Sequence, residues 1–214
     1  MMKLGLWLAE KGFIPDFLLR VAIRKLSLTR LKDKSLLSEK SKIAASFKEG
    51  PIAEQTLEAN EQHYEVPPLF FTKVLGKNLK YSCCFYETQK ETLIEAEEKM
   101  LELYLSRAEI CDGQNVLDLG CGWGSFSLFA AKRFPNSVFT SISNSQDQIN
   151  FINEEAKSRG LSNIKAFKVD INDLDLEDKF DRIVSIEMFE HMRNYEKLLS
   201  KVAIMLAENG KLFV

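Results

Sequence analysis

The sequence predicts an α/β fold in which helices cover a parallel β-sheet, preceded by a helical N-terminal extension. From residue 115 onward, short apolar runs alternate with segments of helical periodicity, which is typical of strands joined by crossover helices. One apolar run, Val116–Leu119, leads into Gly120, Gly122 and Gly124 and then into a helix. Glycines between a buried strand and a helix N-terminus let the backbone turn sharply and approach an anionic ligand closely.

The elements follow from this periodicity. We expect strands at 115–119, 137–142, 164–169, 181–186 and 211–214, and helices at 123–134, 145–159 and 195–207. Residues 91–107 form a further helix, because their apolar side chains recur on one face. A ligand of such a sheet binds at the carboxyl ends of the strands, near the first strand of the predicted series.

The N-terminal quarter differs in charge from the rest. The net charge of the 214 residues is −2, but residues 1–48 contain eleven basic and four acidic residues. The spacing of apolar residues in this segment predicts short amphipathic helices, with Pro15 in a first turn. We expect residues 1–60 to form a helical lid rather than a membrane-surface anchor, and residues 61–214 to form the main domain. Residues 52–64 are expected to be helical, and Pro67–Pro68 extended.

Composition excludes several classes of protein. An acidic body does not suit a nucleic-acid-binding enzyme, so we expect no nucleic-acid partner. The four cysteines form no Cys-x-x-Cys or Cys/His cluster, so neither a metal site nor a disulfide scaffold is expected. No apolar run is long enough to span a membrane, and no signal peptide is evident. We therefore expect a cytoplasmic protein, with peripheral lipid contact as the one membrane interaction left open.

The glycine spacing is informative about the ligand. The pattern after Asp118 is G-x-G-x-G, whereas a dinucleotide site has its third glycine three positions after the second. The stretch resembles motif I of the S-adenosyl-L-methionine (SAM) methyltransferases. In those enzymes the glycines pass under the methionine and ribose parts of the cofactor. The resemblance implies that Asp118 lies near the ammonium group of the cofactor and that Gly120, Gly122 and Gly124 contact it.

Further motifs narrow the family. They are H-Y-E-V-P-P at 63–68, L-K-Y-S-C-C-F at 79–85, G-C-G-W-G at 120–124, S-I-S-N-S-Q at 141–146 and F-D-R-I-V-S-I-E-M-F-E-H-M at 180–192. This ordered set resembles the cyclopropane-fatty-acid synthase-like methyltransferases and, within them, the coclaurine N-methyltransferase branch. The resemblance implies a Rossmann-like domain that binds SAM and transfers its methyl group to a small amine.

The resemblance also implies the cofactor-binding residues. Tyr81 and Ser82 would reach the methionine part of SAM. Ser141, Ile142 and Gln146 would stand where many methyltransferases place an acid on the ribose hydroxyls, and an amide can both donate to and accept from a diol. Asp170 and Ile171 would meet the adenine.

Glu187, Glu190 and His191 follow the strand expected at 181–186 and are the candidate catalytic residues. Histidine can accept a proton near neutral pH, and a carboxylate can orient it. Three-residue spacing on a helical turn would point Glu187 and Glu190 the same way, toward a cationic amine.

Two other functions remain open. One is a cyclopropane synthase acting on unsaturated phospholipid, in which Cys83 and Glu190 would help to bind bicarbonate. Synthases of this type usually have a small residue at the position of Glu187, which favours the amine. The other is a SAM-binding or interaction protein without catalysis, because family members continue beyond the position of Val214 with further strands and part of the substrate pocket. The strand at 211–214 is accordingly expected at a sheet edge. The oligomeric state cannot be predicted.

Overall fold

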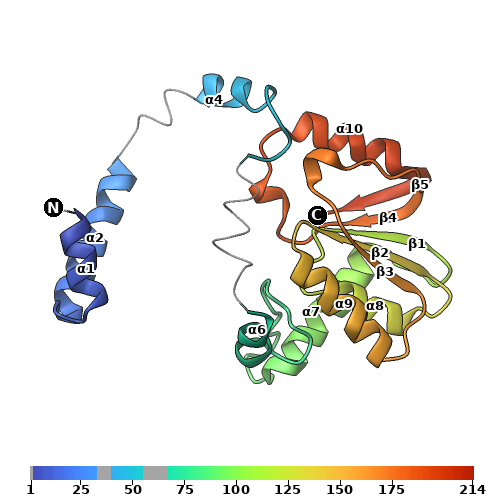
Figure 1. Ribbon diagram of the computed structural model, residues 1–214, viewed down its shortest axis with the longest axis horizontal. Helices are drawn as coiled ribbons and strands as arrows, with labels where there is room; N and C mark the ends of the chain where they lie inside the picture. The colour runs from blue at the N-terminus through green and yellow to red at the C-terminus, as the bar shows by residue number, and fades with distance from the viewer. Residues whose placement is uncertain (1, 33–39, 55–66) are drawn as a thin grey trace. The chain divides into compact units, whose positions relative to one another are not determined.

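The computed structural model describes residues 2–32, 40–54 and 67–214 (Figure 1). The chain divides into two compact units between Ser46 and Phe47. In the first, α1 spans Met2–Glu10, α2 spans Asp16–Lys32 and α4 spans Lys40–Ser46. Pro15 directly precedes α2, and its carbonyl accepts a hydrogen bond from the Leu18 N–H at 3.0 Å.

The lid function of residues 1–60 stays a prediction. Flotation with anionic liposomes tests it. Salt-sensitive binding to the liposomes that disappears when residues 1–48 are deleted would contradict a lid and indicate a membrane-surface anchor.

The second unit is built on a five-stranded parallel sheet of order β3-β2-β1-β4-β5. The strands are β1 (Asn115–Leu119), β2 (Val138–Ser143), β3 (Ile164–Lys168), β4 (Phe180–Val184) and β5 (Leu206–Phe213). The chain runs outward from β1 to β3 and then crosses back to β4 on the other side of β1. This reversal creates a switch point at the carboxyl end of β1, where open α/β sheets bind ligands. The predicted α/β fold is confirmed.

Helices cover both faces of the sheet. Val116 and Val184 belong to a core cluster shared with α7 (Leu93–Arg107), α8 (Ser125–Arg133) and α9 (Gln146–Ser158). Leu117 and Leu119 belong to a second cluster, shared with α10 (Tyr195–Met205). Neighbouring residues of β1 enter different clusters because successive side chains of a strand point to opposite faces. Figure 1 shows α10 on one side of the sheet and α8 and α9 on the other.

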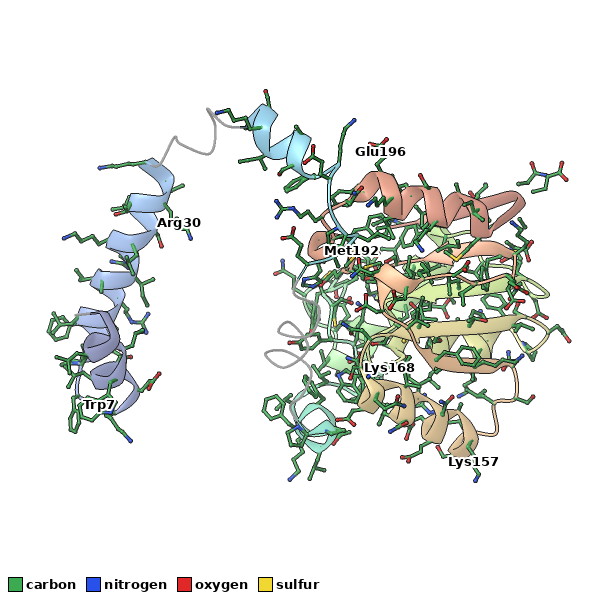
Figure 2. The ribbon with its side chains drawn as sticks, turned by 45° about the horizontal axis from the view of Figure 1, so that its top comes forward. Trp7, Arg30, Lys157, Lys168, Met192 and Glu196 are labelled. Carbon is green, nitrogen blue, oxygen red and sulfur yellow. The ribbon has the colours of Figure 1, made fainter. Side chains whose placement is uncertain are left out.

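Most charged side chains lie on the outer faces of these helices, although Glu97 of α7 is fully buried. In Figure 2, Lys157 of α9 and Glu196 of α10 extend away from the sheet. Met192 instead packs against the cluster beneath α10. The amphipathic pattern that predicts these helices therefore also predicts which face of each is buried.

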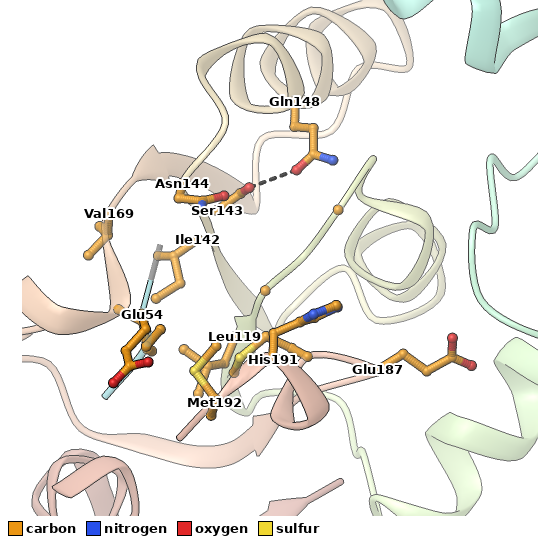
Figure 3. A pocket seen from close by; sticks show the side chains of 15 residues that line it. Glu54, Leu119, Ile142, Ser143, Asn144, Gln148, Val169, Glu187, His191 and Met192 are labelled. Carbon is orange, nitrogen blue, oxygen red and sulfur yellow. Dashed lines mark hydrogen bonds between the residues drawn. The ribbon is translucent and has the colours of Figure 1, made fainter. Parts of the chain in front are cut away.

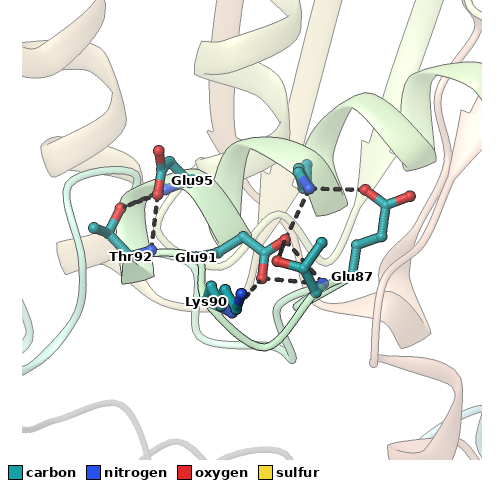
Figure 4. Close-up of polar contacts among 7 residues, drawn as sticks. Glu87, Lys90, Glu91, Thr92 and Glu95 are labelled. Carbon is teal, nitrogen blue, oxygen red and sulfur yellow. Dashed lines mark hydrogen bonds and ion pairs between the residues drawn. The ribbon is translucent and has the colours of Figure 1, made fainter.

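The N-terminus of α7 carries a complete capping box. The Thr92 hydroxyl accepts a hydrogen bond from the Glu95 N–H, while the Glu95 carboxylate accepts one from the Thr92 N–H at 2.8 Å (Figure 4). Lys99, one turn further along, pairs with Glu87 and Glu91 at 2.8 Å each. These contacts fix the loop that leads from residue 85 into α7.

Three predicted details need correction. Pro67 is extended, but Pro68 is the first residue of α6 (Pro68–Val74), because a proline at this position loses no helical hydrogen bond. Strand β5 begins at Leu206 rather than at residue 211, and a register shift against β4 accommodates the added length. Residues 52–54 are bends and not helix, while the rest of the helix expected at 52–64 lies outside the described residues.

Residues 47–54 belong to the second unit, where Ile52 is buried in the same cluster as α10. β5 lies at the sheet edge, as expected. In the described part of the chain, every helix is too short or too polar to cross a bilayer.

Candidate active site

The three glycines after β1 have different roles. All have positive φ, at 84° for Gly120, 53° for Gly122 and 75° for Gly124. A Cβ on Gly120 would lie 2.6 Å from Met188 Cγ, and one on Gly124 would lie 2.7 Å from Ile152 Cγ1. A Cβ on Gly122 would meet nothing within 4 Å. Gly120 and Gly124 are therefore also required for packing, whereas Gly122 presents bare backbone to open space.

That open space is a cleft of two adjoining cavities. The first, of about 140 Å³, lies over the ends of β1 and β2 (Figure 3). The second, of about 180 Å³, extends toward residues 79–82 and α7. Both cavities are lined by Gly120, Gly122, Gln148, Glu187 and His191. An elongated ligand spanning both cavities would therefore cross the glycine turn.

The structure brings most of the predicted cofactor residues to this cleft. Ile142 and Ile171 line the first cavity. Tyr81, Ser82 and Asp118 line the second. The two predicted isoleucines thus line one cavity, and the three predicted polar residues line the other.

Other predicted cofactor residues line neither cavity. Gln146 is exposed, and its Nε2 donates to Asn150 Oδ1 at 2.8 Å. Asp170 caps a short 3₁₀ turn, Ile171–Asp173, by accepting from the Asn172 N–H at 2.9 Å. Ser141 is buried and donates to Ser127 Oγ at 2.7 Å. Gly124 is the N-cap residue of α8. Their predicted contacts with the cofactor stay predictions.

Asp118 is deeply buried, with 2% of its surface exposed. Its carboxylate accepts a hydrogen bond from Ser127 Oγ. Burial raises the pKa of Asp118 to about 7, and the Ser127 hydrogen bond only partly offsets this. Burial likewise raises the pKa of the neighbouring Cys121 thiol. The floor of the cleft therefore holds a carboxyl group that titrates near neutral pH.

The three candidate catalytic residues share the second cavity. Glu187 has a left-handed backbone, with φ at 51°, and lies before the 3₁₀ turn Phe189–His191. The expected helical turn carrying both Glu187 and Glu190 is therefore wrong. The left-handed residue redirects the chain after β4, and all three side chains still line one cavity. Figure 3 shows Glu187 and His191 together at the edge of the first cavity.

Cys83 contributes through its backbone. Its N–H donates to Glu187 Oε1 at 3.3 Å, which ties the 79–85 segment to the end of β4. Its thiol is exposed, and the residue lines neither cavity.

Sequence reasoning missed three features of the site. Gln148 lines both cavities; its Oε1 accepts from Ser143 Oγ at 2.7 Å, while its buried Nε2 has no partner among the described residues. Lys80 lines the second cavity although it is almost fully buried. Ala53 and Glu54 line the first cavity from the segment before the main fold. Of these features, only Lys80 had a sequence signal, because it stands inside the motif at 79–85.

Ala53 is held in place by paired hydrogen bonds. Its N–H donates to Asn172 Oδ1 and its carbonyl accepts from Asn172 Nδ2, each at 3.1 Å. The Ile52 carbonyl accepts from the backbone N–H groups of Arg193 and Asn194. The segment before the main fold is therefore a fixed wall of the first cavity.

Comparison with known proteins agrees with this architecture. The family model for mycolic acid cyclopropane synthetase matches residues 53–214. The chain therefore belongs to the mycolic acid cyclopropane synthetase family. The predicted resemblance to cyclopropane synthase-like methyltransferases is confirmed.

Within the family, the chain is similar to plant N-methyltransferases. It is 41% identical to (S)-coclaurine N-methyltransferase of Thalictrum flavum subsp. glaucum over 96% of its length and 58% of that enzyme. A crystal structure of coclaurine N-methyltransferase bound to N-methylheliamine and SAH superposes with a TM-score of 0.89 at 36% identity, covering 99% of this chain and 62% of that one. Cyclopropane-fatty-acyl-phospholipid synthase of Escherichia coli (strain K12) is 30% identical over 70% of this chain and 38% of that enzyme. The chain thus spans about three fifths of the length of the coclaurine N-methyltransferases that it matches.

Proposed function

We propose that this protein binds SAM in the cleft above Gly122 and transfers its methyl group to a small amine. The observation that carries the proposal is the carboxylate of Glu187, held at the junction of the two cavities beside Glu190 and His191. The similarity to plant N-methyltransferases over 96% of the chain supports it.

The residues of the cleft fit SAM. Gln148 Nε2 and Trp123 Nε1 are buried hydrogen-bond donors without partners among the described residues, and both residues line the second cavity. Buried donors normally have acceptors, so these two favour a ligand rich in oxygen and nitrogen acceptors. Ile142 and Ile171 would pack on the adenine, while Tyr81, Ser82 and Asp118 would face the amino-acid part.

Bound SAM supplies an electrophilic methyl group on a sulfonium. The protein must bring a neutral amine lone pair to that methyl group and accept the proton that the amine loses. Glu187 and Glu190 would attract an ammonium substrate into the second cavity. His191, in the same cavity, would accept its proton. Cys83 would keep Glu187 oriented through the N–H contact.

Methyl transfer from labelled SAM tests this function, with secondary and tertiary amines assayed beside vesicles of unsaturated phospholipid. We expect transfer to at least one amine and none to the lipid. Transfer to the lipid alone would contradict the amine assignment and indicate a cyclopropane synthase. SAM binding with no transfer to either would indicate a non-catalytic protein.

Glu187→Gly sharpens this test. Glycine adopts the left-handed conformation at φ 51° without strain, so the fold should be retained. Removing the carboxylate should raise the KM of a cationic amine by roughly 10- to 100-fold, since hydrogen bonds to charged groups contribute about 1.5–3 kcal/mol. The Kd of SAM should change little. An unchanged KM would show that Glu187 does not contribute to amine binding.

Gly122→Val should abolish binding of S-adenosylhomocysteine, because the new side chain would fill open space within the cleft. Gly160→Val is a matched control. Gly160 has a similar φ of 67° and open space around its Cβ, but it lines neither cavity. Both variants should lose similar stability from backbone strain, on the order of 1–2 kcal/mol. If titration calorimetry finds normal affinity in Gly122→Val, the cofactor binds elsewhere.

A further inference from the structure

Lys80 is a buried cation in the wall of the cleft. Only 5% of its surface is exposed, and it lines the second cavity. Its ammonium group donates to Ser82 Oγ and, at 3.0 Å, to Tyr104 Oη. It also lies 4.7 Å from the centre of the Tyr104 ring. These contacts fix the side chain against α7.

The contacts leave the charge of Lys80 without a direct counterion. No carboxylate of the described residues lies within ion-pair distance of its Nζ. Two hydroxyls account for two of its three N–H groups. Desolvation lowers the pKa of Lys80, although Cys83, Cys84, Glu187 and Glu97 act in the opposite direction. A buried ammonium without a paired anion is costly, so an anionic ligand bound beside Lys80 would lower that cost.

Other donors at this cavity also lack partners. Trp123 Nε1, Ser125 Oγ and Gln148 Nε2 are all buried and unpaired among the described residues, and all three residues line the second cavity with Lys80. Ser125 opens α8, whose N-cap, Gly124, supplies no side-chain acceptor. The first N–H groups of that helix favour negative charge as well. The lining of the second cavity therefore combines a cation, three polar groups unpaired among the described residues and a helix N-terminus.

We propose that Lys80 binds the carboxylate of the cofactor and makes the site select ligands that carry this group. The proposal rests on the proposed function, since it requires SAM in the cleft. An ammonium–carboxylate pair would use the remaining N–H of Lys80 and supply its missing counterion. Ser82 and Tyr104 then act as positioning residues, because they hold the ammonium at the cavity.

Two ligands separate this role from a structural one. S-adenosylhomocysteine carries the carboxylate, and its decarboxylated analogue has the same adenosine, thioether and amino groups without it. Titration calorimetry on the wild-type chain should give a Kd roughly 10- to 100-fold lower for S-adenosylhomocysteine, the range expected for a hydrogen bond to a charged group. Lys80→Met should raise that Kd by a similar factor and change the Kd of the analogue less than about threefold. Lys80→Arg, which keeps the charge, should retain part of the preference.

Lys157→Met is the control, because Lys157 is an exposed lysine of α9 outside both cavities. It should leave both Kd values unchanged. An equal loss of affinity for both ligands in Lys80→Met would show that Lys80 only supports the fold, and would overturn the proposal. Equal wild-type affinity for the two ligands would overturn it without any variant, even if Lys80→Met fails to fold. Failure of the wild-type chain to bind either ligand would instead overturn the proposed function itself.

Discussion

Replacing His191 with alanine is expected to lower kcat by ~10²–10⁴-fold, the usual contribution of general-base assistance. The residue follows β4 through the 3₁₀ turn Phe189–His191 and lines the second cavity with Glu187 and Glu190. The Kd of SAM should change little, because the proposed cofactor contacts come from other residues. Raising the pH should partly restore the rate of His191→Ala, since more of the amine is then neutral before it binds.

His191→Asn is the matched comparison. An amide fills much of the same space and can form hydrogen bonds, but it does not accept a proton near neutral pH. If His191 acts as a base, both variants should be slow. If His191 only packs the turn, His191→Asn should retain most of the activity. If the single-turnover rate of methyl transfer in His191→Ala equals that of the wild type, this residue is not the base.

Periodicity predicted the sheet because elements such as β1 and α7 bury apolar residues that lie close together in the sequence. Val116–Leu119 and the helical stripe of α7 needed no information from distant parts of the chain. The element boundaries were less predictable. Pro68 could open a helix only because α6 finds a core contact, in which Phe71 packs against Trp123 at 4.9 Å between ring centroids. That contact joins residues 52 positions apart.

The site was predictable where the backbone itself makes it. The glycine turn could be located from the sequence, because φ values above zero restrict the residue type. The sequence could not show that, of the three glycines in this turn, Gly122 is the one with open space at its Cβ. This depends on Met188 and Ile152, which fill the space beside Gly120 and Gly124.

Side-chain directions were the least predictable part of the site. Gln146 and Gln148 both lie in the first turn of α9, yet only Gln148 lines the cleft. The position on the helix that faces the cleft depends on the angle at which α9 packs on the sheet. The left-handed backbone of Glu187 had no sequence signal, because non-glycine residues adopt it only when tertiary contacts stabilise it.

Asp118 should make the stability of the ligand-free protein depend on pH. Its pKa rises from 3.8 in the unfolded chain to about 7 in the folded one, so the folded state binds the proton more tightly. The stability that this provides is complete below pH ~4 and is lost as the pH rises through ~7. About three pKa units correspond to about 4 kcal/mol in the free energy of unfolding.

Chemical denaturation of the wild type and Asp118→Asn between pH 4.5 and 8 would measure this effect. Asparagine does not titrate. The unfolding free energy of the wild type should therefore fall relative to that of Asp118→Asn as the pH rises. Parallel pH profiles would show that Asp118 does not titrate in this range.

Cofactor binding should depend on the same carboxyl group. If the ammonium of the cofactor lies near Asp118, as the family resemblance implies, bound ligand favours the ionised form. The affinity for S-adenosylhomocysteine should then increase as the pH rises from 5 toward 7, and binding should release a proton in that range. Calorimetry in two buffers of different ionisation enthalpy would detect the proton. Asp118→Asn should abolish both the release and the pH dependence, whereas wild-type binding without proton release would place the ammonium away from Asp118.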